Sequence, residues 1–141
     1  MSRTFLLAAV IAIAFLGMAD SWYLYQSAIT DTALSCDLGA ALNGCNIVAQ
    51  SPYSELFGVP LALYGIGFFT LQFALGIALL ALSSRWLQLA LYAISIAGGL
   101  ASLAFLFIQF ALIKAVCVYC ILSALSAFAL FFLSRALWKR A

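Results

Sequence analysis

Two of the cysteines in this 141-residue chain are spaced so that they can react with each other. Cys117 and Cys120 form a C-x-x-C motif in "AVCVYC", at the start of an apolar stretch. Residues three apart on a helix are neighbours, close enough to bridge or to share a metal ion. A helix start lowers the pKa of a thiol, and Lys114 adds positive charge nearby. These features are typical of a nucleophilic thiolate whose mixed disulfides are resolved by a second cysteine.

The other two cysteines, Cys36 and Cys45, lie in a long polar connection with eight residues between them. Four cysteines allow three disulfide connectivities, and a sequence alone cannot choose among them. The natural pairs by spacing are Cys36–Cys45 and Cys117–Cys120. We expect all of them to lie on one side of a membrane, in an oxidising compartment where disulfides persist.

Three other interpretations of the cysteines are weaker. Cysteine is often a small buried apolar residue, but a group gathered at one membrane face is not explained that way. Four thiolates bind zinc, yet one pair opens a membrane helix and the chain has no histidine, so we expect no metal site. A C-x-x-C disulfide is also a poor static crosslink, because it closes a very short loop.

The composition is that of an integral membrane protein. Hydrophobic residues make up 68% of the chain and charged residues 7%, and the mean hydropathy is +1.22. Soluble domains are about half apolar and about a quarter charged. The net charge of +2, without a basic run, gives no indication of nucleic-acid binding.

The apolar residues fall into four stretches, each near the ~20 residues that cross a bilayer. The sequence therefore predicts an all-α integral membrane protein, a four-transmembrane-helix bundle in a single domain over residues 1–141. No alternation typical of barrel strands occurs. The expected helices cover residues 4–25, 59–82, 86–113 and 116–133. The expected outer loop covers residues 27–58.

The first apolar stretch has an alternative interpretation as a cleaved signal peptide, with "GMA" as the cleavage site. Its apolar run is longer than such segments usually are, and it continues into aromatic residues that suit a membrane interface. We therefore expect it to be the first membrane span.

Basic residues predict the orientation. Arg3, Arg85 and the basic group within 135–140 fall on one side, whereas Lys114 alone falls on the other. By the positive-inside rule both termini are cytoplasmic, and the cysteines lie at the outer face. We expect a multi-pass protein of the cell (inner) membrane.

A dithiol at the edge of the hydrocarbon can meet a disulfide arriving from the water and a redox carrier dissolved in the lipid. A quinone such as menaquinone or ubiquinone is the obvious two-electron carrier. We expect its pocket at the outer end of the bundle, beside Cys117 and Cys120. Small residues of the third helix either line it or simply allow tight packing. Candidate aromatic residues for the pocket wall are Phe57, Tyr64, Phe68 and Tyr119.

The order of these elements resembles the vitamin K epoxide reductase family and its bacterial and archaeal disulfide-forming homologues. The resemblance covers nearly the whole chain, through "CDLGAALNGC", then "SPYSELFGVP" leading to Gly65, then "CVYC". The DsbB family also has four helices and four cysteines, but there the C-x-x-C motif precedes the separated pair.

The resemblance implies a role for each cysteine. Cys117 and Cys120 would be the active-site pair, with Cys120 facing the quinone. Cys36 and Cys45 would be a shuttle pair, in which Cys36 meets an external thiol protein and Cys45 passes electrons to Cys117. Ser51 matches a serine that supports the quinone pocket, and its alternative role is to cap a short helix.

The function implied by the resemblance is that of a membrane thiol oxidase that makes disulfides in exported proteins. Because the chain ends at Ala141 without a thioredoxin-like domain, the expected electron donor is a separate thioredoxin-fold (DsbA-like) oxidoreductase. The alternatives are a quinone or vitamin K epoxide reductase with the same relay, and a non-catalytic membrane subunit with structural disulfides. Leu61 and Ala124 stand where the animal enzymes carry asparagine and tyrosine, which argues against the epoxide as substrate.

Overall fold

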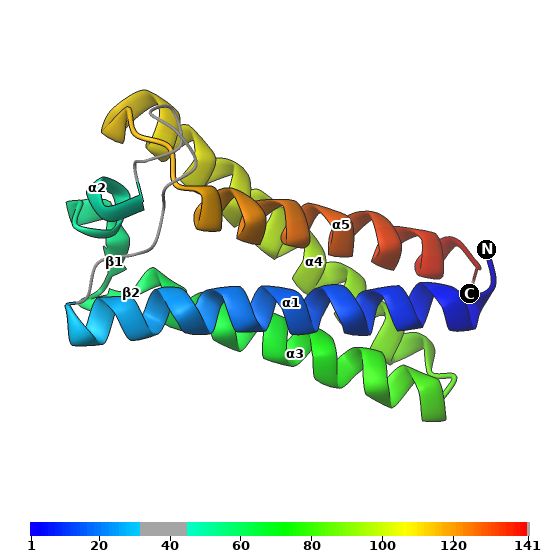
Figure 1. Ribbon diagram of the computed structural model, residues 1–141. Helices are drawn as coiled ribbons and strands as arrows, with labels where there is room; N and C mark the ends of the chain where they lie inside the picture. Colours follow the sequence, from blue (N-terminus) through cyan, green and yellow to red (C-terminus); the bar gives the residue numbers. More distant parts are fainter. Residues whose placement is uncertain (32–44, 141) are drawn as a thin grey trace.

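In the computed structural model, which describes residues 1–31 and 45–140, the chain forms an antiparallel bundle of long helices (Figure 1). Within these described residues, four helical segments are long and apolar enough to cross a membrane. The predicted all-α bundle is therefore confirmed. The segments are α1 (Arg3–Thr30), α3 (Leu61–Ala81), α4 (Arg85–Phe107) continued by a π-helix (η3, Ile108–Ile113), and α5 (Val118–Arg140).

The helix bounds differ most from those expected in α1 and α5. Helix α1 continues to Thr30 rather than to residue 25, because Thr30 Oγ1 donates to the Gln26 carbonyl at 2.6 Å and so satisfies its own polar group within the helix. The helix stops at Asp31, which is left-handed with φ 51°. Helix α5 begins at Val118 and continues to Arg140 rather than ending at residue 133, so its basic residues form polar terminal turns.

The connection between α1 and α3 contains short elements that lie at the end of the bundle opposite the two termini (Figure 1). A two-residue turn, Phe57 (φ 56°) and Gly58 (φ 77°), joins the two strands. Positive φ at both central residues is the geometry that suits a tight antiparallel hairpin. The elements are α2 (Cys45–Ala49), a 3₁₀ turn (η2, Pro52–Ser54), and strands β1 (Glu55–Leu56) and β2 (Val59–Pro60).

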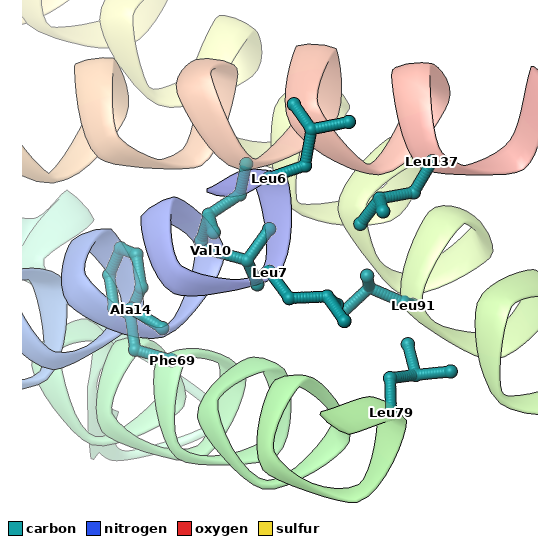
Figure 2. Packing of buried hydrophobic residues seen from close by; sticks show 9 residues of the cluster. Leu6, Leu7, Val10, Ala14, Phe69, Leu79, Leu91 and Leu137 are labelled. Atoms are coloured by element: carbon teal, nitrogen blue, oxygen red, sulfur yellow. The ribbon is translucent and has the colours of Figure 1, made fainter. Parts of the chain in front are cut away.

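The apolar core lies in the half of the bundle that holds the termini. Leu6 and Leu7 of α1 point between α3, α4 and α5 (Figure 2), and their side chains are at most 1% exposed. Gly17 lets the Phe69 ring approach α1 closely, since a Cβ there would lie 2.3 Å from that ring. The remaining buried members are Val10, Ala14, Leu79, Leu91, Leu130 and Leu137.

Polar contacts reinforce this half. The Gln72 amide donates to Ser95 Oγ at 2.8 Å, which ties α3 to α4 inside the core. Arg3 donates to the carbonyl of Leu79 at 2.6 Å, at the last turn of α3. The Arg85 guanidinium lies 4.4 Å from the centre of the Trp138 ring, which joins the start of α4 to the end of α5. The half of the bundle that holds the termini is therefore stabilised by apolar packing and by these polar contacts.

Candidate active site

The C-x-x-C motif sits where the chain turns from the π-helix into α5. Lys114 ends the π-helix in a left-handed conformation (φ 57°), with its N–H bonded to the Gln109 carbonyl. Cys117 then precedes α5, and its carbonyl accepts from the N–H of Ile121 at 3.0 Å. We expected the helix to start at residue 116 and to contain both cysteines. Instead Cys117 is the N-cap residue and only Cys120 is helical.

The Cys117 sulfur acts as the cap of α5. It accepts the backbone N–H of Cys120 at 3.4 Å, as a side-chain oxygen does at other helix starts. A hydrogen bond from the Cys120 thiol, aided by the N–H groups of Tyr119 and Cys120, lowers the pKa of Cys117 against the opposing effect of burial. Both cysteines are free thiols, with Cys117 1% exposed and Cys120 half-buried. Cys117 is therefore the more readily ionised thiol.

A cavity of about 1010 Å³ lies beside the two cysteines. Its walls come from all four long helices and from the connection between α1 and α3. Gly98 of α4 matters to its shape, because a Cβ there would lie 2.3 Å from the Phe68 ring. The main lining residues besides Cys117 and Cys120 are Ser21, Leu24, Ser27, Asn46, Val48, Ser51, Leu61, Tyr64, Phe68, Phe69, Ala97, Gly98, Ala101, Ser102, Phe105, Ser123, Ala124 and Ala127.

The predicted pocket residues do not all reach this cavity. Ser51 and Tyr64 line it. Ser51 Oγ donates to the Val48 carbonyl at 2.7 Å and makes no capping bond to the 3₁₀ turn, although Ser51 stands at its N-cap position. The Tyr64 hydroxyl donates to the Leu56 carbonyl at 3.0 Å.

The other two predicted aromatic residues lie elsewhere. Phe57 is 92% exposed at the hairpin turn and is not among the lining residues. The Tyr119 ring packs against the Tyr23 ring at 5.1 Å between centroids and is not among the lining residues. Of the remaining candidates, Phe68 does line the cavity.

The structure describes only part of the predicted shuttle pair. Cys36 lies outside the described residues, and of Cys45 only the backbone is described, as the first residue of α2. Helix α2 packs at the C-x-x-C motif, because Val48 (2% exposed) and Cys117 belong to one buried cluster. The helix that begins at Cys45 is therefore in contact with Cys117 through Val48.

An acid inside the membrane span escaped sequence analysis. Asp20 is 8% exposed, and its carboxylate accepts a hydrogen bond from Ser123 Oγ on α5. A long α1 makes it an interior residue rather than one near a helix end. The only sequence signal was an acid within an apolar run, because Ser123 is a distant partner in the chain. Within residues 1–31 and 45–140, no three Cys, Asp or Glu side chains form a metal-binding group.

Known proteins resemble this chain over most of its length. The model of the vitamin K epoxide reductase family matches residues 8–135. The thiol-disulfide oxidoreductase LTO1 of Arabidopsis thaliana is 34% identical over 124 residues, which cover 83% of this chain and 32% of that protein. The chain thus spans about a third of the length of this relative.

Proposed function

The chain belongs to the vitamin K epoxide reductase family, and on that premise we propose that it is a membrane thiol oxidase that reduces a quinone. Its thiol substrate is a separate thioredoxin-fold protein of the DsbA type, which forms disulfides in exported proteins. Electrons pass from this partner to Cys36 and Cys45, then to Cys117 and Cys120, and then to menaquinone, ubiquinone or a similar quinone. The protein lies in the cell membrane with both termini in the cytoplasm.

The single observation that carries the proposal is a C-x-x-C pair in the wall of a cavity of about 1010 Å³ at one end of a membrane bundle. Pockets for small molecules measure about 300–1,000 Å³ and are mostly apolar with a few polar groups. This cavity combines aromatic rings such as Phe68 and Phe105 with serine hydroxyls. A quinone, which has an apolar ring and two carbonyl acceptors, suits such a lining.

The two thiols of the C-x-x-C motif have different roles. The reduced Cys45 thiol attacks the Cys117–Cys120 disulfide at the Cys117 sulfur, and Cys120 leaves as a thiol. Cys36 then attacks Cys45 and releases Cys117, whose lowered pKa makes it a good leaving thiolate. Cys120 lies at the cavity and delivers electrons to the quinone. In one cycle two partner thiols become a disulfide, and the quinone gains two electrons and two protons to become a quinol. The packing of Val48 of α2 against Cys117 supports transfer from Cys45 to Cys117.

Ser51 and Tyr64 are the proposed polar contacts of the quinone, because both line the cavity. Leu61 and Ala124 line it as well. These are the positions at which the resemblance to the animal enzymes would call for asparagine and tyrosine. Aliphatic side chains leave an epoxide oxygen without those hydrogen-bond partners, so we propose an ordinary quinone rather than vitamin K epoxide as substrate.

The test is anaerobic mixing of the purified oxidised protein with a reduced thioredoxin-fold protein and a soluble quinone. We expect quinol to form in proportion to the thiols oxidised, and each of the four cysteine-to-serine variants to lose this activity. Replacing Cys36 and Cys120 together should accumulate a Cys45–Cys117 disulfide, because the resolving thiols are gone. Non-reducing mass mapping identifies it. Quinone reduction that survives loss of Cys36 or Cys45 would contradict the relay, and variants that only unfold would favour structural disulfides.

A further inference from the structure

Asp20 is an ionisable group held inside the bundle without a basic partner nearby in the sequence. Its carboxylate is buried in α1, well before that helix ends at Thr30. Helix α3 contains no Lys or Arg, and α5 contains none before Arg135. A carboxyl group within a membrane span is costly, and such groups commonly belong to a proton path or a substrate site.

Ser123 connects this acid to the cavity. Ser123 follows Cys120 by three residues on α5, so the two side chains are neighbours on the helix surface. Both line the cavity, whereas Asp20 lies behind them and is not a lining residue. The Ser123 hydroxyl, which donates to the Asp20 carboxylate, is therefore the bridge between the acid and the space beside Cys120.

Other titratable groups around Asp20 are few. Asp20 interacts electrostatically with Cys117, Tyr119 and Cys120, at the start of α5. On α3 the only titratable side chain is Tyr64. On α1 Tyr23 packs against Tyr119.

Two further acids line the cavity, Asp31 at the end of α1 and Glu55 in β1, and both are exposed. Asp20 is the buried one. Among the acids that the structure describes, it is therefore the one that can hold a proton beside the cysteines away from bulk water.

We propose that Asp20 and Ser123 form a proton relay between the Cys120 thiol and the quinone, an inference that rests on the proposed function. Oxidation of the cysteine pair breaks two S–H bonds, forms one S–S bond and releases two electrons and two protons. The quinone takes both electrons, and its two oxygens take both protons. Asp20 holds one of these protons between its departure from Cys120 and its arrival on the quinone, and the Ser123 hydroxyl passes it in each direction.

The relay solves a specific electrostatic problem. A thiolate on Cys120 beside the thiolate of Cys117 would place two negative charges in a largely apolar site, which is unfavourable. If Asp20 is ionised, it adds a third charge. Transfer of the Cys120 proton to Asp20 keeps the total charge constant. Asp20 is a positioning residue in this scheme, because it orients Ser123 and reaches the cavity only through it.

The experiment compares Asp20→Asn, Asp20→Glu and Ser123→Ala in the quinone assay across pH, using full-length protein with its thiol partner. Asp20→Asn preserves size and still accepts from Ser123, but it cannot hold the proton. We expect kcat to fall at least about 100-fold, the lower range for loss of acid–base assistance, with KM for quinone little changed. The deficit should shrink as pH rises, because hydroxide then takes the Cys120 proton. Asp20→Glu should restore part of the activity.

The matched control is Ser126→Ala. Ser126 is a half-buried serine of α5 that does not line the cavity, and its hydroxyl donates to the Leu122 carbonyl at 2.9 Å rather than to Asp20. It should keep wild-type kcat, whereas Ser123→Ala should lose activity with the same pH dependence as Asp20→Asn.

Three results would overturn the relay. The first is wild-type turnover by Asp20→Asn with an unchanged pH profile. The second is an equal loss of activity at every pH together with a loss of thermal stability, without rescue by glutamate, which is the behaviour of a structural bond. The third is a pH-dependent loss that follows Asp31→Asn or Glu55→Gln instead. The shuttle step distinguishes failure of the relay from failure of the proposed function. In a single turnover, pre-oxidised Asp20→Asn should oxidise the thiol partner at the wild-type rate. Failure of the wild-type protein to reduce quinone at all would reject the proposed function itself.

Discussion

The Cys117 sulfur occupies a position that oxygen usually takes at the start of a helix. Ser, Thr, Asp and Asn are preferred there because their oxygens accept an unpaired N–H of the first turn. A thiol is a weak acceptor, but a thiolate is charged and lies at the positive end of the helix dipole. The cap is therefore stronger when Cys117 is ionised, which is the form released when the Cys45–Cys117 disulfide is resolved.

This coupling predicts how the pKa of Cys117 depends on Cys120. Cys120→Ala removes the thiol that hydrogen-bonds to Cys117, so the pKa of Cys117 should rise. Cys120→Ser retains a hydroxyl donor, so the pKa should stay closer to the wild-type value. The measurement is the ultraviolet thiolate absorbance against pH, with Cys36 and Cys45 replaced by serine. Equal pKa values in the two variants would show that the backbone N–H groups alone stabilise the thiolate.

At the scale of elements, the shape of the cavity depends on how α4 meets α3. Gly98 leaves room for the Phe68 ring, and that ring forms part of the cavity wall. Gly67 is the neighbour of Phe68 on α3, and a Cβ added there would meet nothing within 4 Å. The two glycines therefore separate the effect of crowding from the effect of removing glycine from a helix.

We expect Gly98→Ala to push the Phe68 ring toward the cavity and to raise KM for quinone about tenfold, the lower end of what one methylene changes in an apolar pocket. Gly67→Ala should leave KM unchanged and raise the free energy of unfolding by up to about 1 kcal/mol, because alanine favours helix. Steady-state kinetics and thermal unfolding of both variants provide the check. An unchanged KM in Gly98→Ala would mean that Phe68 moves away from the cavity instead.

At the scale of the whole molecule, the structure separates two ends. The termini lie at one end, and α2, β1 and β2 lie at the other (Figure 1). The basic residues Arg3, Arg85 and Arg140 begin or end helices at the terminal end. This distribution predicts that the terminal end faces the cytoplasm.

Single-cysteine labelling tests the orientation in cells whose natural cysteines in this protein are replaced. Phe57→Cys, at a position 92% exposed, should react with a membrane-impermeant maleimide from outside the membrane. Ser83→Cys, exposed in the turn between α3 and α4, should react only after permeabilisation. The reverse pattern would place the C-x-x-C motif in the cytoplasm, where a disulfide-forming role is untenable.

The helices could be predicted from sequence because long apolar runs admit few other structures in a membrane. The end of α1 could not, since Thr30 satisfies its hydroxyl within the helix and polarity alone suggested a loop. The spacing of Cys117 and Cys120 indicated the candidate site, but the capping role of Cys117 depends on how the π-helix ends at Lys114. The hydrogen bond between Ser123 and Asp20 joins residues far apart in the chain, so no local sequence pattern predicts it.

The confinement of the apolar core to the terminal half has a consequence for mutational tolerance. Truncation of Leu6 or Leu79, both 0% exposed, removes buried packing and should lower the free energy of unfolding. Side chains such as Leu61, Ala124 and Ala97 border empty volume, so exchanging them changes what the cavity accepts without dismantling that core. Descendants of this chain can therefore diverge in their electron acceptor while keeping the same anchoring half, and directed evolution toward a different quinone should begin with these residues.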